Sequence, residues 1–205
     1  MDKIRFGLIG SGWRAEFYIR IAKAVPEQFE LTKVLIRDKE KGEAFGRRHN
    51  VRTVQTLEEL LADDPDYVVL SVKRGITSGY LERLFERGIP VLCETPPAEE
   101  MDCLNALWEQ YKKYDAKVQI AEQYIQQPLY AAWDKVIRDG RLGRVENINI
   151  SSLHGYHGAS MIRRFLDVGY ENGVIYGKRF WFDVTETYGR DGMVFDGDIF
   201  SCSRD

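Results

Sequence analysis

A glycine turn close to the N-terminus is the feature that most constrains the fold. The apolar run Phe6–Ile9 is typical of a buried strand, and it ends at Gly10-Ser11-Gly12. The following residues 13–25 have apolar side chains at helical spacing, which predicts a helix: Phe17, Ile21, Ala22 and Ala24. A strand, a glycine turn and a helix in this order are typical of a loop that binds the phosphates of a dinucleotide.

Each small residue of this turn has an expected role. Gly10 permits the tight turn, Gly12 lets the backbone approach a pyrophosphate, and Ala15 keeps the helix close to the strand. The N-terminus of the helix offers unpaired N–H groups and the positive end of its dipole. We therefore predict that the whole turn contacts the cofactor: Gly10, Ser11, Gly12, Trp13, Arg14 and Ala15.

Strands and helices alternate along the first 123 residues. Six short apolar runs are typical of buried strands: 6–9, 31–36, 53–54, 67–72, 90–94 and 118–122. Helical patterns separate them: 13–25, 39–49, 57–61, 77–87 and 98–114. This alternation predicts an α/β domain over residues 1–123, with a doubly wound parallel (Rossmann) sheet.

The pattern changes from residue 124 onward. Residues 128–138 and 158–166 are typical of helices, residues 145–153 alternate like an antiparallel strand, and further strands follow at 174–176 and 179–187. We predict a partial α+β domain over residues 124–205, with a mainly antiparallel sheet that serves substrate binding or oligomerisation. The aromatic run Phe180–Phe182 needs a cover. Either a partner subunit provides it, which predicts a homo-oligomer, or the chain is shortened from something longer.

Composition narrows the class of protein. A net charge of -3 and a pI of about 5.7 imply no general affinity for nucleic acid or for an anionic membrane. No apolar run approaches the roughly 18 residues that a membrane span needs, and the N-terminus does not resemble a signal peptide. The three cysteines form no C-x-x-C pair. We therefore expect a reduced, cytoplasmic protein that acts on a small molecule.

Three motifs together resemble the Gfo/Idh/MocA family of NAD(P)-dependent oxidoreductases, the glucose-fructose oxidoreductase and inositol dehydrogenase group. They are the turn Gly10-Ser11-Gly12, the Val-Leu-Cys-Glu-Thr-Pro run at 91–96, and residues 140–145 (Gly-Arg-Leu-Gly-Arg-Val). The resemblance covers essentially the whole chain. It implies a nucleotide-binding first domain, an open-sheet second domain that covers the cofactor and often forms the oligomer interface, and a sugar- or polyol-like substrate. Members are usually longer, so the resemblance also implies a shortened second domain.

The chain departs from the family at three chemical positions. Where the family has Glu-Lys-Pro, with a lysine that polarises or protonates the reacting oxygen, this chain has Glu94-Thr95-Pro96. Thr95 cannot carry a positive charge, although it can hydrogen-bond a substrate oxygen. The family's Asp-x-Gly-x-His aligns with residues 153–157, which keep the glycine and His157 but have leucine at the acid. His157 is thus the proton-transfer candidate. In the third departure, residues 72–77 (Val-Lys-Arg-Gly-Ile-Thr) stand where the family often has Thr-Pro-Asn-x-x-His.

That third departure puts two cations after the fourth strand. Lys73 and Arg74 follow Val72 at the edge where open α/β sheets bind ligands. One interpretation is that they contact cofactor phosphate or substrate, or that Lys73 replaces the family's lysine. The alternative interpretation is that they form a solvated loop pair. Glu94, at the end of the neighbouring strand, is expected either to orient the cofactor or to cap the next helix. We include Val72, Arg74 and Glu94 among the cofactor contacts and Lys73 among the catalytic candidates.

The end of the second strand bears on the choice of cofactor. An acid there would bind the adenosine ribose, but this chain has Ile36, followed by Arg37 and Asp38. Arg37 can meet a 2′-phosphate, which favours NADP over NAD; alternatively Arg37 and Asp38 simply begin a helix. No metal site is predicted, because His154 and His157 have no third ligand close by in the sequence.

The sequence thus supports two functions. The first is an oxidoreductase that transfers a hydride between nicotinamide and a sugar- or polyol-like substrate. The second is a catalytically degenerate dinucleotide-binding or regulatory protein of the same fold.

Overall fold

The structure is a computed structural model, which describes residues 3–151, 155–169, 171–174 and 176–177, and the backbone of 187–188 and 194–195. The chain forms two compact units, Met1–Leu166 and Asp167–Asp205. The first unit contains the sheet and all the helices described below. The predicted domain boundary between residues 123 and 124 lies inside this unit and stays a prediction.

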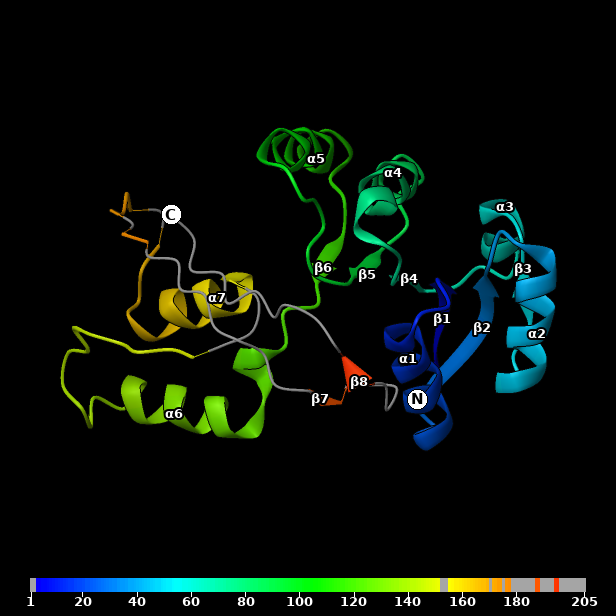
Figure 1. Cartoon of the computed structure of the whole chain (residues 1–205). Helices are drawn as coiled ribbons and strands as arrows, with labels where there is room; N and C mark the ends of the chain where they lie inside the picture. The colour runs from blue at the N-terminus through cyan, green and yellow to red at the C-terminus, as the bar shows by residue number, and fades with distance from the viewer. Residues whose placement is uncertain are drawn as a thin grey trace. The chain divides into compact units, whose positions relative to one another are not determined.

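A six-stranded parallel sheet is the centre of the first unit (Figure 1). Its strands are β1 (Ile4–Ile9), β2 (Phe29–Leu35), β3 (Thr53–Val54), β4 (Tyr67–Leu70), β5 (Val91–Cys93) and β6 (Val118–Ile120). Their order across the sheet is β3-β2-β1-β4-β5-β6, and every neighbouring pair is parallel. The chain builds outward from β1 to one edge and then from β4 to the other. The predicted doubly wound sheet is confirmed, and β1 and β4 flank the switch point at which such sheets bind ligands.

Both faces of the central strands are buried, which explains their uninterrupted apolar sequences. Successive side chains of a strand point to opposite faces: Leu8 belongs to one core cluster, and Ile9 to the other. In β4, Val69 packs on the same side as Leu8, whereas Val68 and Leu70 pack with Ile9. A strand covered on both sides needs apolar residues at every position.

The helices agree with the predicted ones except at some ends. They are α1 (Trp13–Ala24), α2 (Lys39–His49), α3 (Leu57–Leu61), α4 (Arg74–Phe85), α5 (Met101–Tyr114), the 3-10 turn η1 (Tyr124–Gln126), α6 (Pro128–Arg138) and α7 (Gly155–Phe165). Helix α4 begins three residues before the predicted Thr77, directly after its N-cap Lys73. Helix α3 starts with a capping box between Thr56 and Glu59, which satisfies two backbone donors.

The predicted helix α1 is confirmed, and its buried face differs from its largest apolar residues. The residues that pack on the sheet are Ala15, Ile19 and Ala22, at the i, i+4, i+7 spacing of one helix face. Phe17 and Ile21 lie on another face and are 38% and 47% exposed. Two small alanines on the packed face let α1 lie close to the sheet, which a phenylalanine there would prevent.

The chain after β6 continues into a helical pair. Helices α6 and α7 pack against each other and against η1, and Arg164 binds Asp134 through two hydrogen bonds of 2.9 and 2.8 Å. The strand predicted at 145–153 is wrong over residues 145–151, which form no strand. Alternation alone makes an amphipathic segment, and a strand also needs a ladder partner; none pairs with 145–151 in the described part of the chain.

In the second unit, β7 (Thr187–Tyr188) pairs antiparallel with β8 (Val194–Phe195). Most of the strands predicted between 174 and 187, including Phe180–Phe182, lie outside the described residues, so the larger antiparallel sheet stays a prediction. None of the helices described above is long and apolar enough to cross a bilayer.

Candidate functional site

A cleft of about 730 Å³ lies at the carboxyl ends of β1, β2 and β4. Three segments line it: the glycine turn, the end of β2 with the start of α2, and the end of β4 with α4. The lining residues are Ile9–Arg14, Leu35–Asp38, Lys41, Ser71–Lys73, Ile76 and Tyr80. The cleft therefore occupies the switch point of the sheet, the expected position for a ligand of this fold.

The two glycines of the turn have different geometric roles. Gly10 has a φ of +126°, and a Cβ there would lie 1.9 Å from the carbonyl oxygen of Ser71, so only glycine fits. Its N–H donates to the carbonyl of Leu35 at 3.2 Å, which fixes the turn to β2. A Cβ at Gly12, in contrast, would meet no atom of the described residues within 4 Å. The space in front of Gly12 is thus open to a ligand.

The start of α1 suits an anion. Gly12 is the N-cap and provides no side-chain hydrogen bond to the first amides of the helix. Ala15 is completely buried, so the helix starts directly on the sheet. These are the features that let backbone amides and the helix dipole face a phosphate group.

Two exposed cations lie where the end of β2 meets α2. Ile36 is buried in the core and offers no hydrogen bond to a ribose. Arg37 and Lys41 are exposed and line the cleft. Asp38 caps α2 by accepting from the amide of Lys41 at 2.9 Å. The predicted alternative, that this segment begins a helix, thus holds for Asp38, while Arg37 stays available to the cleft.

Of the two cations that follow β4, Lys73 lines the cleft and Arg74 does not. Val72 also lines the cleft. Lys73 is the N-cap of α4, and its carbonyl accepts from the hydroxyl of Thr77 at 3.3 Å. Lys73 is therefore a lining residue of the cleft whose backbone is fixed at the start of a helix.

The carboxylate of Glu94 is held by two side chains of α1. Its Oε1 accepts from Arg14 Nε at 2.8 Å and from the hydroxyl of Tyr18 at 2.5 Å. Burial, and then the hydrogen bond to Glu94, raise the pKa of the Tyr18 phenol well above its ordinary value. The alternative prediction that Glu94 caps the next helix is wrong, because the N-cap of α5 is Glu100.

His157 is paired with a carboxylate. Its Nδ1 lies 2.6 Å from Oε2 of Glu122, and its ring stacks on Tyr124 with a centroid distance of 4.4 Å. The other carboxylate oxygen of Glu122 accepts from the amide of Tyr124 at 3.0 Å. An ionised carboxylate can only accept, so this partner assigns the proton to Nδ1 and makes Nε2 the basic nitrogen of a neutral ring.

A chain of contacts joins these groups. Arg14 also donates from Nη2 to Oε1 of Gln123 at 2.9 Å, and Gln123 is the residue next to Glu122. The structure thus brings the glycine turn, Glu94 and the residues around His157 together. Thr95 follows Glu94 but is not among the residues that line the cleft.

Four residues of this arrangement were missed by the sequence analysis: Lys41, Tyr18, Glu122 and Gln123. Signals for two of them exist in the sequence. Tyr18 lies one helical turn after Arg14, so the two share a face of α1. Glu122 is the last residue of the strand predicted at 118–122, at the same sheet edge that pointed to Lys73 and Glu94. Lys41 and Gln123 have no comparable signal.

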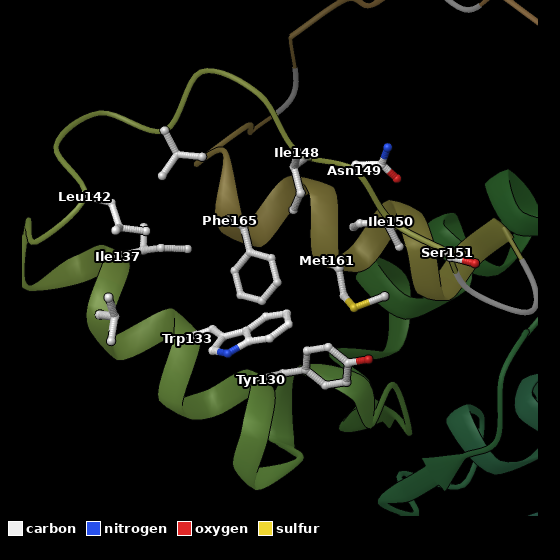
Figure 2. Close-up of a pocket in the computed structure, with 12 residues that line it drawn as sticks. Tyr130, Trp133, Ile137, Leu142, Ile148, Asn149, Ile150, Ser151, Met161 and Phe165 are labelled. Carbon is white, nitrogen blue, oxygen red and sulfur yellow. The ribbon is translucent and has the colours of Figure 1, made fainter.

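A second, apolar groove of about 470 Å³ lies between α6, α7 and the segment 142–151. Figure 2 shows Trp133 of α6 and Phe165 of α7 pointing toward each other, with Ile148 and Ile150 above them. The alternating apolar residues of 145–151 thus face helices. Among the described residues, no carboxylate, imidazole or cationic side chain lines this groove, so we look for proton or hydride chemistry in the cleft at the glycine turn.

Comparison with known proteins agrees with the geometry of the cleft. Residues 4–124 match the GFO_IDH_MocA family, described as an oxidoreductase family with an NAD-binding Rossmann fold. An inositol 2-dehydrogenase of Rhizobium meliloti is 29% identical over 153 residues, which cover 73% of this chain and 45% of that protein. The chain spans less than half the length of the curated relatives that it matches.

Solved structures share the fold. The scyllo-inositol dehydrogenase of Lactobacillus casei, with bound NAD(H) and scyllo-inositol, superposes with a TM-score of 0.69 at 14% identity, covering 81% of this chain and 57% of that one. The WlbA dehydrogenase of Bordetella pertussis, in complex with NADH and UDP-GlcNAcA, gives a TM-score of 0.62 at 23% identity, covering 70% and 44%. With the parallel sheet, the glycine turn and the family match over residues 4–124, this chain belongs to the GFO_IDH_MocA family of oxidoreductases with an NAD-binding Rossmann fold.

Proposed function

We propose that this chain binds NADP or NAD in the cleft at the glycine turn and transfers a hydride between nicotinamide and a sugar- or polyol-like substrate. The observation that carries the proposal is the open space in front of Gly12, where a Cβ would meet no atom in the part of the chain that the structure describes. The bound cofactor supplies the hydride donor or acceptor. The side chains and backbone amides of this chain bind the cofactor, hydrogen-bond the substrate and transfer the proton.

The glycine turn and α1 hold the pyrophosphate in this proposal, through backbone amides from Gly10 to Ala15 and the helix dipole. Arg37 precedes the N-cap of α2, Lys41 lies in its first turn, and the two leave positive charges toward the adenosine end of the cleft in this proposal. A 2′-phosphate would find charge-assisted hydrogen bonds there. NADP is therefore favoured over NAD.

His157 is the proposed proton-transfer residue. Nδ1 keeps its proton and donates it in a hydrogen bond to Glu122. In the proposed reaction, Nε2 takes a proton from a substrate hydroxyl during oxidation and returns it during reduction. Lys73 and Thr95 follow the neighbouring strands β4 and β5 and are proposed to hydrogen-bond the substrate oxygen. The polyol class is supported by the names of the relatives, two of which are inositol dehydrogenases.

A second function rests on one residue. Thr95 stands where the resemblance predicts a lysine, and a threonine hydroxyl is a weak acid near neutral pH. A dinucleotide-binding protein without turnover would keep the glycine turn and lose this charge. Such a protein would bind cofactor as tightly as an enzyme and show no redox change.

Turnover distinguishes the two functions. The full chain is incubated with NADP or NAD and a panel of inositols, other polyols, sugars and amino sugars, and reduced nicotinamide is followed by its absorbance. The enzyme function predicts turnover with at least one compound and a loss of about 100-fold or more in His157→Ala, the typical size of general acid–base catalysis. Cofactor binding without turnover across the panel contradicts it and supports the second function.

Cofactor choice has its own test. Arg37→Gln is expected to weaken NADPH binding about tenfold or more and to leave NADH binding within about twofold, because only NADPH offers a phosphate to that side chain. Arg20→Gln is the matched control, since Arg20 lies on α1 over the ring of Phe17 and does not line the cleft. Equal weakening of both nucleotides would overturn the assignment of Arg37.

A further inference from the structure

We infer that Arg14 is a positioning residue: its guanidinium ties the glycine turn to the segment that carries the Glu122–His157 pair. The catalytic meaning of this link rests on the proposed function, while the link itself is a property of the cofactor-free chain. Arg14 was predicted from sequence as a cofactor contact. Arg14 lines the cleft, so that prediction stands, and the contacts of its side chain add a positioning task.

The fork of Arg14 is engaged at both ends. Nε donates to Glu94 at 2.8 Å and Nη2 donates to Gln123 at 2.9 Å. The side chains of Arg14 and Glu94 are only 23% and 15% exposed, so the ion pair is partly shielded from solvent. A guanidinium that already serves two acceptors in two loops is a brace between those loops.

The Glu94 end of the brace is firmly held by the sheet. The amide of Glu94 donates to the carbonyl of Leu70 at 2.9 Å, which continues the β4–β5 ladder by one bond. Its carboxylate also receives the Tyr18 hydroxyl. Because Arg14 and Tyr18 both come from the first half of α1, Glu94 fixes the direction in which the Arg14 side chain leaves the glycine turn.

The Gln123 end has fewer backbone constraints. Strand β6 ends at Ile120, and only Ala121 continues the ladder, with its amide donating to Cys93 at 2.8 Å. Glu122 and Gln123 lie past the last sheet bond. Their backbone hydrogen bonds are local: the amide of Glu122 donates to the carbonyl of Ile120 at 2.8 Å, and the carbonyl of Gln123 accepts from the amide of Gln126 at 2.9 Å. Arg14 holds Gln123, and the adjacent Glu122 holds His157 at 2.6 Å. Loss of the Arg14 contact should therefore loosen the Glu122–His157 pair.

The test uses a spectroscopic signature of that pair in the cofactor-free protein. In full-length chain labelled with ¹⁵N-histidine, the Nδ1–H proton of His157 is observed by NMR and assigned by its loss in His157→Gln. Arg14→Met removes the brace, and Gln123→Ala removes only its far end while leaving the Arg14–Glu94 ion pair. Arg20→Met, on the same helix without a contact to the pair, is the matched control.

The expected result is that exchange of the His157 ring proton with water becomes about tenfold faster, or more, in Arg14→Met and in Gln123→Ala, and is unchanged in Arg20→Met. The double variant should be no faster than the faster single variant, because both changes break one link. Unchanged exchange in Gln123→Ala would overturn the inference, and that variant decides the question even where Arg14→Met fails to fold. The result does not depend on nucleotide, so failure of the chain to bind NADP or NAD would overturn the proposed function alone.

Discussion

His157 Nδ1 lies 2.6 Å from Oε2 of Glu122, although the two residues are 35 positions apart and come from a helix and from the segment just after β6. The side chains are only 10% and 19% exposed, so water competes little for this hydrogen bond. A carboxylate on one ring nitrogen fixes both the tautomer and the orientation of the ring. In the proposed function, Glu122 thus prepares His157 to exchange a proton through Nε2.

Replacing Glu122 by glutamine tests this role. A glutamine amide can turn its NH₂ group toward Nδ1, which would favour the opposite tautomer and leave Nε2 protonated. We expect kcat to fall about 10- to 100-fold, with little change in the affinity for cofactor, the range found for partners that orient a histidine. Glu146→Gln, at an exposed position, is the control. A rate equal to that of the unmodified chain would show that Glu122 does not act through His157.

Replacing each glycine of the turn by alanine should change the free energy of unfolding by very different amounts. Gly10→Ala puts a Cβ 1.9 Å from the Ser71 oxygen at a φ of +126°, so we expect the free energy of unfolding to fall by roughly 3 kcal/mol. Gly12 has a φ of -79° and open space, so Gly12→Ala should change stability by less than about 1 kcal/mol. Urea unfolding followed by circular dichroism measures both. Equal losses would mean that the turn is not built as described.

The thiols of Cys93 and Cys103 should differ sharply in reactivity. Cys93 is fully buried, and burial followed by the nearby charge of Glu94 raises its pKa to about 12. At pH 8 only about one in ten thousand Cys93 side chains is then a thiolate, the reactive form. In a Cys202→Ser background, a disulfide reagent should modify one thiol of the native chain quickly and the second only after denaturant is added. Loss of the fast phase in Cys103→Ser identifies it; two fast thiols in native protein would contradict the buried position of Cys93.

Tyr18 predicts the behaviour of the protein in alkali. Burial and the contact with Glu94 raise the pKa of its phenol above the ordinary value near 10. The unfolded chain therefore releases this proton before the native one does, and the stability that Tyr18 contributes is present below about pH 10 and is lost above it. Tyr18→Phe should make the fall in unfolding free energy above pH 10 less steep, by up to about 1.4 kcal/mol per pH unit. The fully exposed Tyr176→Phe is the control and should keep the original slope.

The sheet could be predicted from the sequence because its strands are buried on both faces. Continuous apolar runs such as Tyr67–Leu70, separated by helical patterns, leave few other folds open. The apolar pattern did not predict which neighbouring element an apolar segment packs against. Phe17 and Ile21 have the spacing of a core face of α1, yet they are exposed. Residues 145–151 alternate like a strand, yet the apolar side chains of this segment face α6 and α7.

The site could be predicted only in its local parts. The glycine turn, Arg37 and the cations after β4 follow from position at the ends of strands. The pairs that organise the site join residues far apart in sequence: Arg14 and Glu94 are 80 positions apart, and Arg14 and Gln123 are 109. Such pairings depend on side-chain directions in the folded chain, which periodicity and spacing do not contain.

The central claim, that the cleft in front of Gly12 is the cofactor site, is tested most directly by calorimetric titration of the full chain and of Gly12→Val with NADPH and NADH. Valine at this position meets no protein atom at its Cβ, so the variant should keep its fold by circular dichroism. We predict that the unmodified chain binds at least one nucleotide and that Gly12→Val, still folded, binds neither, because its side chain fills the space of the pyrophosphate. Undiminished binding by a folded Gly12→Val chain, or no binding by the unmodified chain, would contradict the claim.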